Sequence, residues 1–249
     1  MTYYPDLAGR VVIITGGTSG IGESVVRAFA ANDCRVAFLG RSRDRGAALV
    51  AELGGNVHFF PCDLVDVNAL RDALGQIHAR LGPACALINN AANDQRQKFE
   101  DVTGEDFERM MAVNFRHVFF ACQAILPQMR ALGGGSIINM SSGAWVGGVV
   151  DLEAYSSAKA AIVGLTNSLA RSVGPDRIRV NALVPGMIFT ERQRRLWFKD
   201  ESLVATGIAR QCLQEEVTGE DVANAALFLA SNDSRMITKQ FIMVNGGLR

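Results

Sequence analysis

Lysine and tyrosine are scarce in this sequence, and its formal net charge is zero. Of its 25 basic residues, 21 are Arg and only four are Lys (Lys98, Lys159, Lys199 and Lys239). Two of the three tyrosines stand at positions 3 and 4, so Tyr155 is the only internal one. The 25 acidic residues balance the basic ones across 249 residues. A nucleic-acid-binding protein usually carries a basic excess, so we expect no nucleic-acid partner.

Closely spaced cysteines and long apolar runs are also missing. The five cysteines form neither a CxxC pair nor a metal knuckle, which predicts buried thiols in a reducing compartment and no metal site. The N-terminus lacks a positive segment followed by an apolar one, so no signal peptide is expected. No apolar stretch has the length of a membrane span. We therefore expect a soluble, cytoplasmic protein with no membrane partner.

Short apolar runs alternate with longer segments of helical periodicity. Such alternation is typical of a doubly wound parallel sheet buried on both faces by helices. The helical segments include a long one over 105–132 and another over 155–173. No linker divides the chain, so 1–249 is predicted to be one domain, with an irregular, Arg-rich lid or substrate region near 186–217. The predicted strands are 11–15, 35–39, 57–62, 84–89, 136–140, 178–184 and 241–244.

A glycine-rich turn follows the first predicted strand and opens the first helix. It reads TGGTSGIG over 15–22 and has the spacing G-x-x-x-G-x-G. Glycines let the backbone approach a pyrophosphate, and the helix N-terminus offers free N–H groups. Taken alone, the turn could be a tight strand–helix connection, but its position in a βαβ unit favours dinucleotide binding.

The end of the second strand bears on the choice of cofactor. An NAD-specific site usually carries a carboxylate there, whereas this sequence has Gly40 followed by Arg41 and Ser42. Arginine can pair with a 2′-phosphate. The pattern favours NADP and leaves NAD use open; the alternative interpretation is a solvated surface loop.

Tyr155 and Lys159 share one face of a predicted helix because they are four residues apart. A phenol has a reference pKa near 10, and a neighbouring ammonium favours its ionised form. Lysine suits this task because it is a compact point charge with donors to spare. The pair therefore predicts an acid/base site, although YxxxK in isolation is more often an ordinary amphipathic pair.

Along nearly its whole length, the sequence resembles the short-chain dehydrogenase/reductase family. The matching motifs stand in the family's order: TGGTSGIG at 15–22, Asp63, NNAA at 89–92, Asn114, Ser142, YSSAK at 155–159 and PGMIFT at 185–190. The resemblance implies a Rossmann-like sheet of about seven strands and NAD(P)-dependent hydride transfer. Ala92 departs from the family pattern, which usually has Gly there.

The resemblance also implies residue roles. Tyr155 would be the general acid/base, Lys159 its pKa modulator and a ribose ligand, Ser142 the holder of the reacting oxygen, and Asn114 the support of a water relay. The cofactor would contact Gly16, Thr18, Ser19, Gly20, Ile21, Gly22, Arg41, Ser42, Asp63, Leu64, Asn90, Ala91, Tyr155, Lys159, Pro185, Gly186, Ile188 and Thr190.

The variable segments resemble those of bacterial pentose 1-dehydrogenases, which oxidise D-xylose or L-arabinose to a lactone. A polar run over 93–98 would suit a sugar, and Trp145 could stack on its ring. Each feature also has a simpler interpretation, as solvated loop for the run and as core or interface for Trp145. The expected substrate contacts are Asn93, Asp94, Ser142, Trp145, Tyr155, Arg192 and Gln193.

Three alternative functions remain open on the sequence. A 3-oxoacyl thioester reductase using NADPH would explain the basic cluster Arg192, Arg194 and Arg195 as a docking surface for an acidic carrier protein. Another short-chain alcohol dehydrogenase is the related alternative, and a cofactor-binding sensor or scaffold is the non-enzymatic one. The three histidines are expected at surface or satisfied positions with no chemical role. The family resemblance implies a homo-tetramer or dimer.

Overall fold

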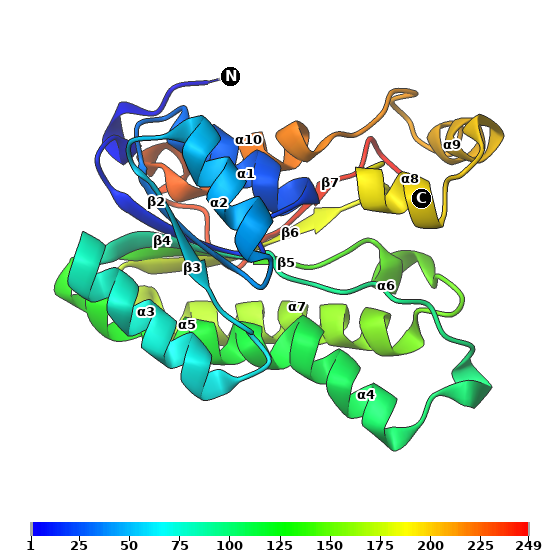
Figure 1. Cartoon of the computed structure of the whole chain (residues 1–249), viewed down its shortest axis with the longest axis horizontal. Helices are drawn as coiled ribbons and strands as arrows, with labels where there is room; N and C mark the ends of the chain where they lie inside the picture. Colours follow the sequence, from blue (N-terminus) through cyan, green and yellow to red (C-terminus); the bar gives the residue numbers. More distant parts are fainter. Residues whose placement is uncertain (1, 249) are drawn as a thin grey trace.

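Seven parallel strands form one sheet in the computed structural model, which describes residues 2–248 (Figure 1). The strand order is β3-β2-β1-β4-β5-β6-β7, so the crossover direction reverses between β1 and β4. The strands are β1 (Val11–Thr15), β2 (Arg35–Gly40), β3 (Val57–Pro61), β4 (Ala84–Asn89), β5 (Gly135–Met140), β6 (Ile178–Pro185) and β7 (Phe241–Val244). The predicted fold class is confirmed, and each expected strand lies within one or two residues of its observed bounds.

Helices cover both faces of the sheet. Two apolar cores result, one on each side, and β1 contributes buried residues to both. One face carries α1 (Gly20–Ala30), α2 (Arg43–Leu53) and α10 (Gly219–Ala230), and the other carries α3 (Val67–Leu81), α5 (His117–Ala131) and α7 (Glu153–Val173). Burial on both faces explains why the strands read as continuous apolar runs rather than as alternating ones.

The long helix expected over 105–132 is interrupted. It consists of α4 (Gly104–Met111), a π-helical turn over Ala112–Arg116, and α5. No change in composition marks the break, because the apolar period continues on both sides of one wider turn. Such turns are rare and are frequent at functional sites.

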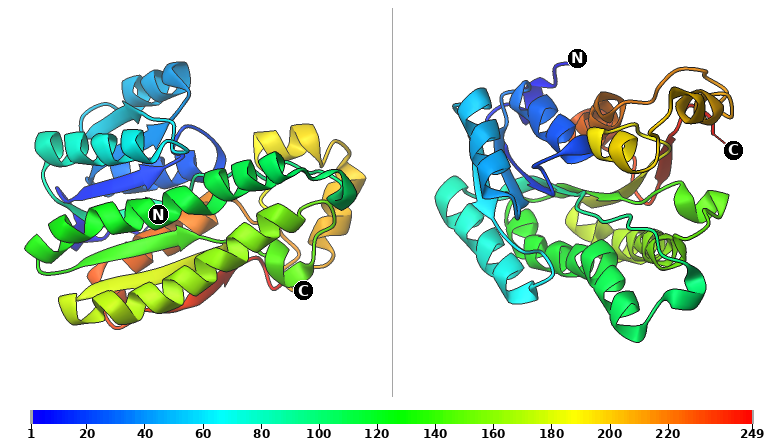
Figure 2. Two further views of the ribbon diagram at one scale, coloured as in Figure 1. Left: turned by 90° about the horizontal axis from the view of Figure 1, so that it is seen from below. Right: turned by 45° about the vertical axis from the view of Figure 1, so that its right-hand side comes forward.

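The carboxyl ends of the strands meet at one edge, where the irregular segments gather. The short helices α6 (Ala144–Gly147), α8 (Glu191–Leu196) and α9 (Glu201–Ile208) lie beyond this edge (Figure 2). A parallel bridge between Ile188 and Val217 joins the two ends of the segment predicted as a lid. Within residues 2–248, no helix combines the length and apolarity needed to cross a membrane.

Candidate active site

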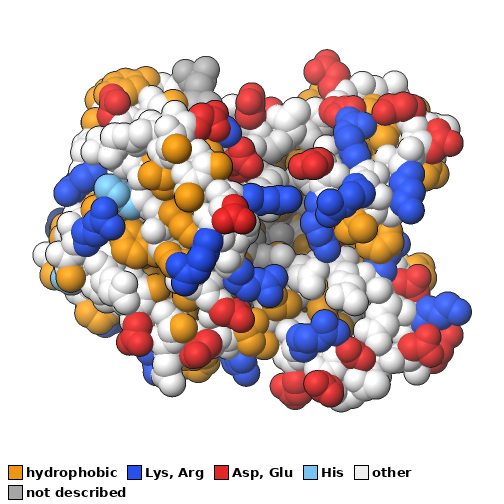
Figure 3. Space-filling model, viewed as in Figure 1, with side chains coloured by type: hydrophobic (Ala, Val, Ile, Leu, Met, Phe, Trp, Pro, Cys, Tyr) orange, Lys and Arg blue, Asp and Glu red, His pale blue; other side chains and the backbone are white. Residues whose placement is uncertain are grey.

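A cavity of about 1180 Å³ runs along the carboxyl edge of the sheet. Lys and Arg side chains gather around the hollow in the middle of the face that Figure 3 shows. The cavity brings together most of the residues that the sequence singled out. Those lining it are Gly16, Thr18, Ser19, Gly20, Ile21, Gly22, Arg41, Asp63, Leu64, Asn90, Ala91, Asp94, Ser142, Tyr155, Lys159, Pro185, Gly186, Ile188, Thr190, Arg192 and Gln193.

The glycine-rich turn needs its glycines for close packing. Gly16 has a φ of +71°, and a Cβ on it would lie 2.7 Å from the Cα of Ala91. A Cβ on Gly22 would lie 2.0 Å from the carbonyl oxygen of Gly16. Asn90 fixes the turn from the neighbouring strand, because its side-chain amide donates to the carbonyls of Thr15 and Gly16 at 3.1 Å each.

The N-terminus of α1 fits a phosphate-bearing cofactor. Ser19 occupies the N-cap position, yet its side chain makes no capping bond among the described residues. The first N–H groups of the helix are therefore left for a ligand, and the helix dipole favours an anion there. On the other wall, the Cγ2 of Thr190 would lie 3.3 Å from a Cβ on Gly20, so the glycine turn and the start of the lid segment flank the same space.

Tyr155 and Lys159 project from α7 into this cavity. The ammonium of Lys159 lies 5.6 Å from the centroid of the Tyr155 ring and donates to the carbonyl oxygen of Met140 at 2.8 Å. Its side chain is buried, with a residue exposure of 1%. The one-turn spacing predicted from the sequence therefore places both groups at a single point, held against the end of β5.

Burial acts on the two groups in opposite directions. It raises the pKa of Tyr155 to about 12, and the Ser142 hydroxyl partly offsets this. Burial also lowers the pKa of Lys159 to about 7, against a smaller opposing effect of Asp94. Both shifts favour the uncharged forms, as expected for groups removed from water. A nearby cation is therefore needed before the tyrosine can work as a base near neutral pH.

Asn114 lies in the π-helical turn and is fully buried. Its side-chain oxygen accepts from the N–H of Asn93 at 2.8 Å, and its amide donates to the carbonyl of Asn93 at 3.0 Å. These reciprocal bonds hold the segment that follows β4. Asn114 itself does not line the cavity.

The lid segment contacts that same segment at the cavity mouth. Arg192 and Gln193, both in α8, bind the carboxylate of Asp94, and Arg192 also donates to the Asn93 side chain at 3.1 Å. Thr190 begins the helix as its N-cap by accepting from the N–H of Gln193. We call this set of contacts between α8 and Asn93–Asp94 the latch.

Three further predicted residues, besides Asn114, are absent from the cavity wall: Ser42, Asn93 and Trp145. Trp145 packs with a buried indole N–H that has no partner among the described residues. The predicted stacking of Trp145 on a sugar ring therefore gains no support from the cavity lining. The tryptophan that does line the cavity is Trp197, and the guanidinium of Arg96 lies 4.8 Å from its ring centroid. The sequence offered no signal for Trp197 or Arg96 beyond the polar and aromatic character of the segments in which they stand.

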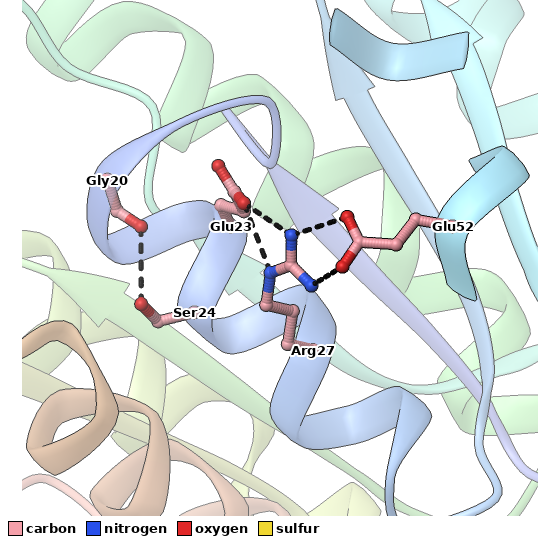
Figure 4. Close-up of polar contacts among 5 residues, drawn as sticks. All are labelled: Gly20, Glu23, Ser24, Arg27 and Glu52. Atoms are coloured by element: carbon pink, nitrogen blue, oxygen red, sulfur yellow. Dashed lines mark hydrogen bonds and ion pairs between the residues drawn. The ribbon is translucent and has the colours of Figure 1, made fainter. Parts of the chain in front are cut away.

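The far end of the cavity holds three arginines, of which one is already engaged. Arg27 in α1 is clamped by two carboxylates: both its Nη atoms donate to Glu52 at 2.6 and 2.8 Å, and it also donates to Glu23 (Figure 4). Arg41 and Arg45 line the same end and make no ion pair within residues 2–248. They are the free cations there.

Gly40 places no acidic side chain at the end of β2. A Cβ on this residue would lie 2.9 Å from the Cγ2 of Thr18 in the glycine-rich turn, so a larger residue would require the Thr18 side chain to shift. The carboxylate that binds the adenosine ribose of NAD in many dinucleotide-binding proteins is absent from that position. No cluster of potential metal ligands occurs among residues 2–248.

Comparison with known proteins agrees with this geometry. The family model described as enoyl-(acyl carrier protein) reductase matches residues 16–249. The chain belongs to the short-chain dehydrogenase/reductase family. It is thus an oxidoreductase that uses a nicotinamide dinucleotide, with the glycine-rich turn and the Tyr155–Lys159 pair in one cavity.

Its similarity to relatives extends over the full length. It is 47% identical to the probable galactose dehydrogenase GalD of Rhizobium meliloti (strain 1021), covering 98% of this chain and 97% of the relative. It is 41% identical to the D-xylose 1-dehydrogenase of Caulobacter vibrioides (strain NA1000 / CB15N), covering 99% and 98%. The crystal structure of a protein assigned as a short-chain alcohol dehydrogenase from Sinorhizobium meliloti 1021 superposes with a TM-score of 0.91 at 28% identity, covering 97% of each chain.

Proposed function

We propose that this protein oxidises an aldose at its anomeric carbon to the aldonolactone, with a pentose such as D-xylose or L-arabinose as the expected substrate. The similarity to two sugar dehydrogenases over the whole chain carries the proposal. The polar cavity mouth supports it, because Asp94, Arg192 and Gln193 offer both acceptors and donors for sugar hydroxyls. D-Galactose and L-arabinose share the orientation of their ring hydroxyls, so one pocket could accept either.

Tyr155 is the base in this proposal. Its phenolate takes the proton of the anomeric hydroxyl, while the hydroxyl of Ser142 donates to the substrate oxygen and orients it. Lys159, held by the Met140 carbonyl, supplies a positive charge that favours the phenolate. A bound oxidised nicotinamide supplies the hydride acceptor and a second positive charge. Proton transfer by a positioned group contributes roughly 10²–10⁴ in rate.

The remaining cavity residues hold the cofactor in this proposal. The glycine-rich turn binds the pyrophosphate, Asp63 and Leu64 lie at the adenine, and Asn90 and Ala91 form the wall of the groove. Pro185, Gly186, Ile188 and Thr190 flank the nicotinamide end. Asn114 does not touch the cofactor and acts indirectly, by holding the backbone of Asn93.

NADP is the proposed cofactor because Arg41 and Arg45 are free at the far end of the cavity and Gly40 carries no acidic side chain. Arg27 does not take part, since Glu23 and Glu52 occupy its donors. Nothing at this end repels NAD, so NAD is the proposed second cofactor.

As a 3-oxoacyl thioester reductase, the protein would need unpaired basic side chains near 192–195 to bind an acidic carrier protein. Arg192 is paired with Asp94, and Arg194 with Glu216 and Glu201. Only Arg195 of the three lid arginines is left to dock an acidic carrier. The pairing inside the chain therefore favours the sugar over the carrier-bound substrate.

One assay panel tests the proposal. Purified protein is given D-xylose, L-arabinose, D-galactose and D-glucose with NADP⁺ or NAD⁺, and separately a 3-oxoacyl thioester with NADPH, while nicotinamide absorbance is followed. We expect turnover of at least one aldose, with lactone detected as its hydroxamate. The Tyr155→Phe variant should lose turnover by at least about 100-fold and still bind NADPH. Turnover of the thioester alone would overturn the proposal.

We also propose a homo-oligomer in the cytoplasm. The sheet ends at β7, where Phe241 and Met243 are 38% and 46% exposed, and an apolar strand edge of this kind favours pairing with a second copy. All five cysteines are free thiols, which fits a reducing compartment.

A further inference from the structure

One short segment forms a wall of the proposed cofactor groove. It begins at Ala91, directly after β4, and Ala91 is packed against the glycine-rich turn so closely that Gly16 cannot carry a side chain. Its N–H donates to the hydroxyl of Thr15 at 3.1 Å. The position of this peptide therefore sets the width of the groove at that point.

The carbonyl of the same residue is held from the opposite side by a histidine. The Nε2 of His117 lies 3.1 Å from the carbonyl oxygen of Ala91. His117 is the first residue of α5 and is 1% exposed, so it lies in the interior. Since a carbonyl oxygen only accepts, Nε2 must carry the hydrogen. Nδ1 is then the bare nitrogen, and it is buried.

His117 and Asn114 act on neighbouring points of the chain. They are three residues apart, on the π-helical turn and the start of α5. Asn114 holds the backbone of Asn93 at 2.8 and 3.0 Å, while His117 holds that of Ala91. Beyond them, Asp94 enters the latch. The groove wall is therefore fixed at both of its ends by one short stretch of helix.

His117 can donate this hydrogen bond to Ala91 in its neutral form. Burial, with a smaller contribution from the Lys159 ammonium, lowers the pKa of His117 to about 4. The imidazole is thus neutral at neutral pH. A permanently charged donor at this position would add a second cation close to Lys159.

We propose that His117 is a positioning residue for the cofactor, which holds the Ala91 peptide in the orientation that shapes the groove beside the glycine-rich turn. The inference rests on the proposed function in one respect, that Ala91 borders the bound cofactor. Without the donor, the Ala91 carbonyl would be left partly buried and unpaired, and an unmade hydrogen bond of this kind favours local rearrangement. The peptide would turn, and the groove would lose its fit to the cofactor.

Two matched variants test it. Gln and Met have nearly the same length and shape, but only Gln can donate to a carbonyl. We expect His117→Met to raise the dissociation constant of NADPH, measured by fluorescence titration, by about tenfold or more. His117→Gln should stay within about threefold of the wild type. NADH is titrated in parallel, because the effect should appear with either cofactor.

Thermal unfolding of both variants without cofactor separates positioning from stability. A merely structural histidine would lower the melting temperature in both and leave the NADPH affinity of the folded protein unchanged. Equal NADPH affinity of the Gln and Met variants would overturn the inference. NADPH binding needs no sugar, so failure of every aldose assay would reject the proposed function and leave this result standing.

A measurement on the wild type covers the case in which His117→Met does not fold. Only three histidines are present, so ¹⁵N-histidine spectra can be assigned with His58→Gln and His78→Gln. The geometry requires the tautomer protonated at Nε2 from pH 6 to 8. A histidine protonated at Nδ1 would also overturn the inference, because it could not donate to Ala91.

Discussion

The most informative single residues are those whose environment sets their ionisation. Lys159 stands where nearly every other basic position has Arg, and it is buried against the Met140 carbonyl. Arginine stays charged under all ordinary conditions, whereas a buried lysine can lose its charge. The pKa of Lys159 at about 7 and that of Tyr155 at about 12 show how strongly the protein alone disfavours their ions. The charge of the oxidised cofactor is therefore an essential part of the proposed base.

Arg41 is predicted to determine the cofactor preference. Replacing Arg41 by Ala removes one of two free cations from the end of the cavity, so KM for NADP⁺ should rise about tenfold while KM for NAD⁺ changes less than twofold. Steady-state kinetics with each cofactor and a saturating aldose measure both values. Arg235→Ala, at a position outside the cavity, is the matched control. An equal rise in both KM values would contradict a role in 2′-phosphate binding.

Burial of His117 should also lower the stability of the folded protein in acid. His117 binds a proton with a pKa near 6.5 when unfolded and about 4 when folded. Between these values the unfolded state binds more protons, so the stability of the folded state falls as pH drops from 6.5 to 4 and changes little from this group below that. The loss should be on the order of 3 kcal/mol.

Denaturant unfolding at several pH values checks this. The fall in unfolding free energy between pH 6.5 and 4 should be smaller in His117→Gln than in the wild type, because glutamine does not titrate. His78→Gln is the control. Parallel curves for the wild type and His117→Gln would contradict the assignment.

At the scale of elements, α8 and the segment after β4 contact each other as a pair. The latch joins α8 to Asn93–Asp94, and the bridge between Ile188 and Val217 closes the base of the lid segment. Asp94 is the shared point, since the same carboxylate meets both Arg192 and Gln193. The loop that follows the sheet therefore fixes where the lid helix lies.

Asp94→Asn tests the latch. The variant keeps the side-chain shape but loses the ion pair with Arg192, so we expect KM for the aldose to rise about tenfold with a smaller fall in kcat. Glu201→Gln is the control, because it weakens an exposed ion pair on the same lid, and such pairs contribute little. Steady-state kinetics with the best aldose measure both. An unchanged KM in Asp94→Asn would show that the latch is irrelevant to sugar binding.

Across the whole molecule, the sheet could be predicted from the sequence and several details of the site could not. Residues such as Ile13 and Leu87 lie in uninterrupted apolar runs, which only a doubly covered sheet explains. The π-helical turn has no such signal, because the apolar period resumes directly after it. His117 was expected at a surface or satisfied position, and its Nε2 does have a hydrogen-bond partner. The sequence did not indicate that this partner is the Ala91 carbonyl in the cavity wall, because that contact depends on the tertiary fold.

The two tryptophans show the same limit of prediction from sequence. Trp145 follows Ser142 by three residues, which predicts proximity, but Trp145 is not among the residues that line the cavity and its indole N–H is buried. Trp197 reaches the wall from a segment whose path depends on contacts distant in sequence, such as the latch. The tertiary path of the chain, rather than residue type, decided which tryptophan lines the site.

The π-helical turn has a consequence for the length of this chain segment. One residue fewer in Ala112–Arg116 would restore a regular helix, and each residue of an α-helix turns the following part by about 100°. With α5 and its first residue, His117, fixed in the core, loss of a residue between Asn114 and His117 would turn Asn114 away from the Asn93 backbone that it now holds. Point substitutions at Ala112 or Val113 leave that phase intact, whereas deletion of a single codon does not. The number of residues in this turn is thus constrained more tightly than their identity.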